Sequence, residues 1–194
     1  MMPIISTTMQ VCKCNLIGNG EAKTAMVSTT HEQIGEGEIC ANTPLYDDGM
    51  IFHTMGYGGG SWLYRLTKGG RRAELVWHNV DLDNLTGGVV KVGDYIYGSG
   101  YKNNAWFCVD WKTGKTMHRD RQIGRSSVIF ADEMLYCYAE RGSVHLVKPN
   151  PNNLEIVNSF KITMGTDQHF AHPVIHRGVL YIRQGNTLMA YKIK

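Results

Sequence analysis

The chain has 194 residues, of which 43% are hydrophobic, with 20 basic side chains against 17 acidic ones. This composition predicts one domain that is long enough to bury a sizeable core, and it excludes disordered and collagen-like proteins. The formal charge is only +3, and the two signs are interspersed along the chain. We therefore expect neither nucleic acid nor an anionic membrane surface as the main partner.

The N-terminal residues 1–8 contain no basic side chain before an apolar stretch, so we expect no signal peptide in this sequence. No apolar run reaches the roughly 18 residues that a membrane span requires, so we expect no membrane insertion. The cysteines are odd in number and widely spaced, which predicts small apolar residues packed in strands rather than a disulfide framework. They are Cys12, Cys14, Cys40, Cys108 and Cys137.

Four segments of the chain repeat one pattern. Each has an apolar strand, a tight turn containing Gly or Asp, and a second apolar strand that ends in an aromatic residue. Because Gly and Asp tolerate positive φ angles, each segment is predicted to be a β-hairpin. The segments are 43–52, 89–97, 127–136 and 173–181, and their closing aromatics are Phe52, Tyr97, Tyr136 and Tyr181.

A third strand follows each hairpin at nearly the same offset, and in three units a fourth strand ends near Trp77, His118 or Phe160. Four antiparallel strands per unit of roughly 40 to 45 residues are typical of β-propeller blades. A β-sandwich is the competing architecture, but it does not require self-similar segments. We predict an all-β fold, a propeller of about four four-stranded antiparallel blades in a single domain 1–194. The approximate blades are 9–30 (half), 38–78, 85–120, 124–162 and 168–194.

Both end units are incomplete. Residues 11–15 and 23–27 read as the last two strands of a blade, whereas the final unit stops after its third strand, 188–192. The strand near Ala25 could pair beside residues 188–192 and close a four-bladed ring. Alternatively, the chain is part of a larger ring, either as a truncated product or as a half-ring that forms a homodimer through its unpaired blade edges.

The corner from Cys108 to His118 resembles the A-x-D-x-x-T-G-x-x-x-W motif of quinoprotein-like (PQQ-binding-like) propeller repeats. Asp110, Thr113 and Gly114 match the motif, and His118 stands where the family usually has Trp. We interpret the corner as a turn whose Asp and Thr side chains bind backbone N–H groups, followed by a ring that locks onto the neighbouring blade. Residues 167–191 resemble the closing blade of members found in gut Bacteroidetes-type bacteria.

This resemblance implies an exported or periplasmic protein, although the sequence itself leaves the compartment open. Many members of the family bind no quinone. The quinoprotein dehydrogenases resemble one another in having eight complete blades, an adjacent Cys-Cys pair, a Trp beneath the cofactor and a bound calcium ion. This chain has no adjacent cysteines and about half the blades. We therefore expect no cofactor, and PQQ in particular is not expected.

Propellers bind ligands where the loops between strands B and C and between blades converge at one face. The glycine-rich B–C loops could make aromatic and bidentate contacts with a glycan or a peptide. The alternative is that their glycines serve tight turns and their polar residues face water. The candidate ligand-binding residues in these loops are Tyr57, Tyr101, Asn103, Asn104, Arg141 and Arg183.

The segment before the last blade adds Asp167, His169 and His172, which could converge at the mouth of the ring. The alternative is ordinary hydrogen bonding within a loop. His172 and His176 would share one face of a strand but lie about 13 Å apart at 3.3 Å per residue, which is too far to ligate one metal. No metal site is therefore assigned.

The sequence favours a non-catalytic binding or scaffolding module, and no catalytic residue is assigned. One alternative is a fragment of a quinone- or metal-dependent oxidoreductase, or of a polysaccharide-related enzyme. Another is a scaffold resembling the propeller lipoprotein of outer-membrane barrel insertion. These alternatives remain open at the level of sequence.

Overall fold

The computed structural model describes residues 8–18, 21–31 and 41–193, and the regular structure of these residues is entirely β-strand. No described segment forms a helix with the length and apolar character needed to cross a membrane. The strands pair in chain order, and every pairing is antiparallel. The sequence-based prediction of an all-β fold is confirmed.

Three sheets are complete four-stranded blades, in which strands A to D follow one another along the chain. The first blade comprises β3 (Leu45–Asp47), β4 (Met50–Met55), β5 (Gly60–Thr67) and β6 (Arg72–Asn79). The second comprises β7 (Val89–Val92), β8 (Tyr95–Gly100), β9 (Ala105–Asp110) and β10 (Thr116–Asp120). The third comprises β11 (Ser126–Ala131), β12 (Met134–Ala139), β13 (Ser143–Lys148) and β14 (Glu155–Lys161).

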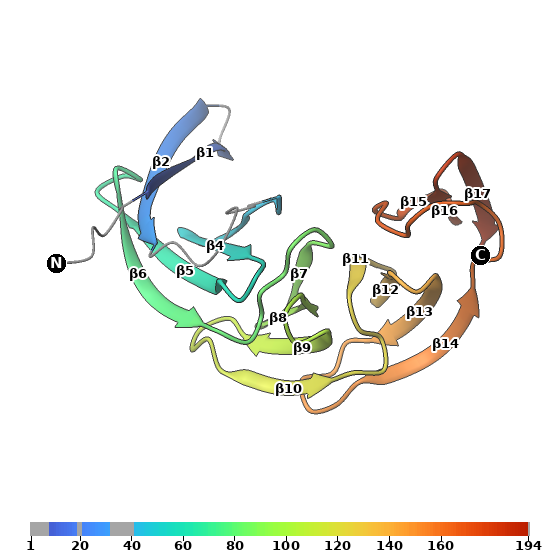
Figure 1. Cartoon of the computed structure of the whole chain (residues 1–194). Helices are drawn as coiled ribbons and strands as arrows, with labels where there is room; N and C mark the ends of the chain where they lie inside the picture. The colour runs from blue at the N-terminus through green and yellow to red at the C-terminus, as the bar shows by residue number, and fades with distance from the viewer. Residues whose placement is uncertain (1–7, 19–20, 32–40, 194) are drawn as a thin grey trace, which may run out of the picture.

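The last blade has three strands, β15 (Val174–His176), β16 (Val179–Gln184) and β17 (Thr187–Lys192). Near the N-terminus, β1 (Thr8–Gly18) and β2 (Glu21–His31) form a two-stranded hairpin. Figure 1 shows the blades following one another along an open arc, with β10 and β14 on its outer side and β7 and β11 on its inner side.

The closed four-bladed ring that the sequence allowed is not formed by the described strands. Ala25 lies in β2 opposite Cys14 of β1, and β17 pairs only with β16. The partner of β2 is its neighbour in sequence, so this pairing needs a far shorter loop closure than pairing with residues 188–192 would. The ends of the arc therefore stay apart within one chain.

The hairpin turns of the four repeats have the predicted backbone geometry. Both central residues have positive φ in the turns at Asp48-Gly49, Asp132-Glu133 and Arg177-Gly178, and Gly93 has positive φ in the second blade. Positive φ at these positions gives a two-residue turn a twist that matches that of the flanking strands. The local sequence thus fixes the register of each A–B hairpin.

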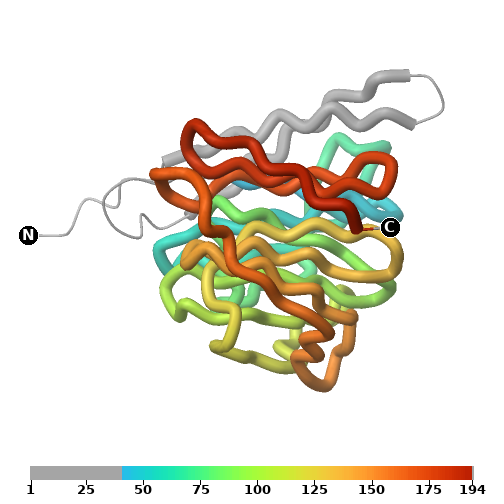
Figure 2. Tube along the Cα trace, turned by 90° about the vertical axis from the view of Figure 1, so that its right-hand side faces the viewer, coloured from blue at the N-terminus to red at the C-terminus, as the bar shows by residue number. Residues whose placement is uncertain are grey.

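The core consists of layers between successive blades. The closing aromatics Phe52, Tyr97 and Tyr136 are buried in three such layers. The fourth, Tyr181, is only partly buried on the last blade. On the same blade, the apolar side chains of Val174 and Leu188 are 56% and 68% exposed. Figure 2 shows this blade nearest the viewer, at one end of the arc. The outer face of the last blade is therefore an interblade face without a described blade against it.

Aromatic rings on the D strands lock neighbouring blades together, as the motif predicted. The indole of Trp77 donates a hydrogen bond to the carbonyl of Trp111 in the second blade (2.9 Å). A Cβ on Gly114 would lie 2.5 Å from the Trp77 ring, so only glycine fits beneath it. His118 occupies the equivalent place one blade further, with Nδ1 3.2 Å from the carbonyl of Pro151. The histidine thus replaces the tryptophan and makes a similar bond.

The turn between β9 and β10 is held by Asp110. Its Oδ1 accepts hydrogen bonds from the backbone N–H of Lys112 (3.1 Å) and Thr113 (2.8 Å), and from the Thr113 hydroxyl (2.7 Å). The hydroxyl of Thr113 in turn accepts from the N–H of Lys115 (3.3 Å). The predicted side-chain bonds to backbone N–H groups are confirmed.

We expect Asp110 to make the free energy of unfolding depend on pH in acidic solution. Partial burial opposes its ionisation, but the hydrogen bonds from Thr113 and Lys112 and the charge of Lys112 outweigh burial and lower the pKa of the carboxyl. Because the folded pKa is the lower one, the unfolded state binds the proton first, so this stabilisation is present above the unfolded pKa of about 4 and is lost as pH falls through the folded pKa. We expect the difference in urea midpoint between the wild type and Asp110→Asn to shrink between pH 6 and pH 3. A difference that stays constant over this range would contradict the assignment.

Candidate functional site

The B–C loops and the connections between blades meet at one face of the arc, called the loop face below. Its scaffold is a set of buried polar side chains that tie the first three blades together. Asp83 lies in the connection between the first and second blades, and its Oδ2 accepts hydrogen bonds from the backbone N–H of Gly58 (2.8 Å) and Lys102 (2.9 Å). One carboxylate thus fixes the B–C loops of two adjacent blades.

Asn84 and Ser99 extend this scaffold toward the third blade. The Asn84 amide donates to the carbonyl of Ser99 (2.7 Å). The Ser99 hydroxyl donates to the carbonyl of Ser126 (3.0 Å) and accepts from its N–H (3.0 Å). Gly87 lies so close to β11 that a Cβ there would be 2.0 Å from the Ser126 carbonyl oxygen. The connection between blades one and two therefore packs directly on the first strand of blade three.

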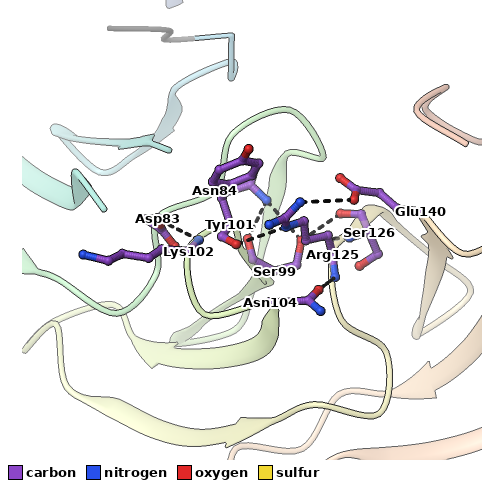
Figure 3. A network of polar contacts seen from close by, with 9 residues as sticks. All are labelled: Asp83, Asn84, Ser99, Tyr101, Lys102, Asn104, Arg125, Ser126 and Glu140. Carbon is purple, nitrogen blue, oxygen red and sulfur yellow. Dashed lines mark hydrogen bonds and ion pairs between the residues drawn. The ribbon is translucent and has the colours of Figure 1, made fainter. Parts of the chain in front are cut away.

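A group of aromatic and charged side chains lies next to this scaffold, and Figure 3 shows all of its members except Tyr57. The Tyr57 and Tyr101 rings meet edge to face with centroids 4.9 Å apart. The guanidinium of Arg125 lies 4.0 Å from the centroid of the Tyr101 ring, and its Nε donates to the Tyr101 carbonyl (3.0 Å). The carboxylate of Glu140 forms an ion pair with Nη1 of Arg125 at 3.7 Å. The Asn104 amide oxygen accepts a hydrogen bond from the backbone N–H of Arg125 (3.0 Å). We call these five residues the Tyr57–Glu140 cluster.

The remaining predicted residues of the B–C loops lie outside this cluster. Asn103 is partly buried in the same loop as Tyr101. Arg141 and Arg183 are exposed, and Nε of Arg183 donates to the carbonyl of Gly185 in its own loop (2.8 Å). The structure thus brings Tyr57, Tyr101 and Asn104 together and leaves the two predicted arginines apart.

Asp167, His169 and His172 contact three different neighbours instead of one another. His169 shares a 2.5 Å hydrogen bond between its Nδ1 and the Tyr138 hydroxyl in the third blade. His172 reaches across to the carbonyl of Thr86 (3.2 Å). The main-chain carbonyl of Asp167 accepts a hydrogen bond from Gln184 in the last blade (2.7 Å). Among the described residues, no group of three His, Cys, Asp or Glu side chains is arranged to hold a metal ion.

Two kinds of titratable group near these loops are held neutral. Burial, and then the charge of Lys161, lowers the pKa of His169, and burial raises the pKa of Tyr138 to about 12.

Of the described cysteines, Cys108 and Cys137 are free and buried, and burial raises the pKa of both thiols, that of Cys108 to about 12. These thiols pack as small apolar side chains, as the sequence predicted. The side chains of Cys12, Cys14 and Cys40 lie outside the described part.

A small depression opens on the loop face between the second and third blades. Its space between atoms of about 280 Å³ includes open solvent, and the enclosed part has room for about one water molecule. Its walls come from four separate stretches of chain, 84–87, 99–101, 125–127 and 169–170, together with Glu140. The candidate residues named from the sequence do not include Asn84, Arg125, Ser126 or Glu140, which all line this depression. Arg125 could have been found from its place in a connection between blades, whereas Ser126 reads as an ordinary strand residue.

No family model matches this chain, and no curated protein matches it either. Solved structures do resemble it. BamB from Moraxella catarrhalis superposes with a TM-score of 0.63 at 13% identity, over 86% of this chain and 50% of that protein. The β-propeller domain of Cps50 (Swd1) from Myceliophteria thermophila gives a TM-score of 0.51 at 10% identity, over 76% and 56%. The fold is a β-propeller.

A putative 6-phosphogluconolactonase from Bacteroides fragilis is also similar, with a TM-score of 0.62 at 12% identity, over 90% of this chain and 57% of that protein. Identities this low show the propeller fold alone. The chain spans about half the length of these three structures. What the described residues provide is therefore an open arc of propeller blades with a fixed loop face.

Proposed function

We propose that this protein is a non-catalytic binding or scaffolding module whose binding surface is the loop face. The observation that carries the proposal is the Tyr57–Glu140 cluster. Tyrosine and arginine side chains supply much of the contact energy at protein interfaces, because they offer large surfaces with few rotatable bonds or a rigid set of donors. Here the ring of Tyr101 and the guanidinium of Arg125 are already in contact.

The cluster is fixed before any ligand arrives. Asp83 holds the backbone of both loops that carry the tyrosines, and Asn104 holds the backbone of Arg125. Preorganised side chains lose less conformational entropy on binding than mobile ones. Tyr57 is nevertheless 41% exposed, so its ring remains available for contact. A glycan or a peptide is the ligand that these groups suit, because both present apolar surface beside hydrogen-bonding groups.

Arrays of immobilised glycans and peptides test this proposal. We expect the labelled wild-type protein to bind members of one array, and Tyr57→Ala to lose at least 10-fold in that binding. The matched control is Tyr46→Ala, because Tyr46 is 55% exposed in β3, next to an A–B turn at the other end of the blade. Absence of binding to both arrays, or equal binding by Tyr57→Ala and the wild type, would overturn the proposal. The homodimer through unpaired blade edges and the absence of a cofactor stay predictions.

A further inference from the structure

The outer face of the last blade carries apolar side chains at positions that the third blade buries. The register places Tyr181 and Leu188 of the last blade where the third blade has Tyr136 and Val144. Tyr136 and Val144 are only 9% and 3% exposed, because the last blade packs against them. Leu188 is 68% exposed, and Val174, on the same face, is 56% exposed. In a propeller, this is the face that the next blade covers.

The edge of β17 is open as well. Among the described strands, β17 pairs only with β16, whereas the third strand of each complete blade also pairs with a fourth. The N–H of Ile193 donates to the carbonyl of Gly178 (2.9 Å). Bonded and non-bonded residues alternate along an antiparallel pair, so the backbone groups of Leu188, Ala190 and Lys192 point to the open edge. Such an edge is a template for another strand.

The other end of the arc carries strands that could occupy this edge. Among the described strands, β1 and β2 pair only with each other. They lie at the first-blade end of the arc, opposite β17 (Figure 1). A two-stranded hairpin is at best marginally stable by itself in water, so it gains from pairing with a further strand. One chain thus has complementary ends that do not meet within that chain.

We propose that the β1–β2 hairpin of a second copy of this chain pairs with the open edge of β17, so that two copies close one propeller ring. A contact between two different ends of identical chains is heterologous, and it forms a closed ring only where the rotation closes. Closure with two copies is supported by the length of the chain, which spans about half of the propeller structures that it resembles. Each copy gives its hairpin at one joint and its β17 edge at the other.

Closure also covers the outer face of the last blade, because the first blade of the second copy then lies against it. The two-fold axis of such a ring runs along its channel, so both loop faces lie on the same side. A ligand that presents its recognised group twice would gain affinity from the two Tyr57–Glu140 clusters. The inference does not depend on what the loop face binds, so either proposal can fail without the other.

Multi-angle light scattering of the purified chain tests the number of copies. We expect a mass of twice 21.8 kDa at micromolar concentration. A monomer at every concentration would overturn the proposal. A series of growing masses would overturn it too, because it would show that the ends join into an open filament instead of a ring.

Two variants test the edge and the face separately. Ala190→Pro removes an N–H that points to the open edge, and Val174→Lys places a charge on the outer face. We expect each to raise the dissociation constant of the dimer by a factor of about 10 or more, because each joint loses a hydrogen bond or buries an unpaired charge. Val157→Lys is the matched control, since Val157 is also 56% exposed but lies in β14 of the third blade.

Far-UV circular dichroism should show that all three variants remain folded. If Ala190→Pro and Val174→Lys dimerise as the wild type does, the copies meet through another surface and the proposal is overturned. If Val157→Lys dissociates the dimer as strongly as Val174→Lys, the outer face of the last blade is not the joint, and the proposal is overturned as well.

Crosslinking of the wild type locates the joint without any substitution. Lys192 lies in β17, and Lys13 and Lys23 lie in β1 and β2. Chains of natural isotope content and chains labelled with heavy nitrogen are refolded together and treated with an amine-reactive crosslinker. We expect Lys192 to be linked to Lys13 or Lys23 in peptide pairs that join a light chain to a heavy one. Links confined to pairs of one isotope would show that the hairpin reaches β17 of its own chain, and they would overturn the proposal.

Discussion

Replacing Trp77 with alanine is expected to lower the free energy of unfolding by about 3–5 kcal/mol, the usual cost of truncating a buried tryptophan. The Trp77 side chain is 8% exposed and packs against Phe52 at a centroid distance of 5.9 Å. It also packs over Gly114 and donates its hydrogen bond to Trp111, both in the next blade. The substitution removes packing and the bond together, and so it weakens the contact between the first and second blades.

Urea unfolding followed by tryptophan fluorescence and circular dichroism measures this effect. Trp77→Phe keeps most of the ring but loses the indole N–H, so we expect it to cost about 1–2 kcal/mol. Val76→Ala is the neighbouring control, since Val76 is 37% exposed and its truncation should cost less than about 0.5 kcal/mol. A loss below 1 kcal/mol for Trp77→Ala would show that the ring does not hold the two blades together.

Replacing Asn79 with alanine is expected to cost about 2–4 kcal/mol, because its side chain satisfies four polar groups in a buried position. Its amide nitrogen donates to the carbonyl of Gly114 (2.7 Å) and to the hydroxyl of Thr116 (3.0 Å) in the second blade. Its amide oxygen accepts from the N–H of Asp81 (2.9 Å) and of Leu82 (3.0 Å). Alanine would leave all four groups without this partner.

Asn79→Asp separates the two halves of this network. It keeps the acceptor for the N–H groups of Asp81 and Leu82 but loses both donors, and it places a charge near Asp81. We therefore expect Asn79→Asp to be at least as destabilising as alanine at pH 7 and to recover in part as the pH falls. Asn158→Ala in β14 is the control, because Asn158 is exposed and its side-chain oxygen accepts a hydrogen bond from the N–H of Ser159 next to it. Equal urea midpoints for Asn79→Ala and Asn158→Ala would disprove a bridging role for Asn79.

The candidate site could be predicted only in part. Loop composition pointed to Tyr57, Tyr101 and Asn104, and the structure brings them together around Arg125. The place of Arg125 in a connection between blades was its only signal in the sequence, because its contact with Tyr101 arises only when the third blade packs against the second. Asp167, His169 and His172 are close in sequence, yet they bond to the last blade, to the third blade and to the connection between the first and second blades, respectively. Proximity along a loop did not predict convergence, since the two histidine side chains and the main-chain carbonyl of Asp167 each bond to a different part of the packed structure.

The sequence by itself determined the blades. Alternating apolar residues and turns with positive φ, such as Asp48-Gly49 and Arg177-Gly178, are local features, and local features fix antiparallel hairpins. The tertiary structure alone decided which elements meet at long range. It left β17 without the strand near Ala25, and it placed Asn84 and Ser126 on the walls of one depression. Such long-range contacts depend on the angle between packed blades and on the entropy of closing long loops, and no single segment of the chain determines either quantity.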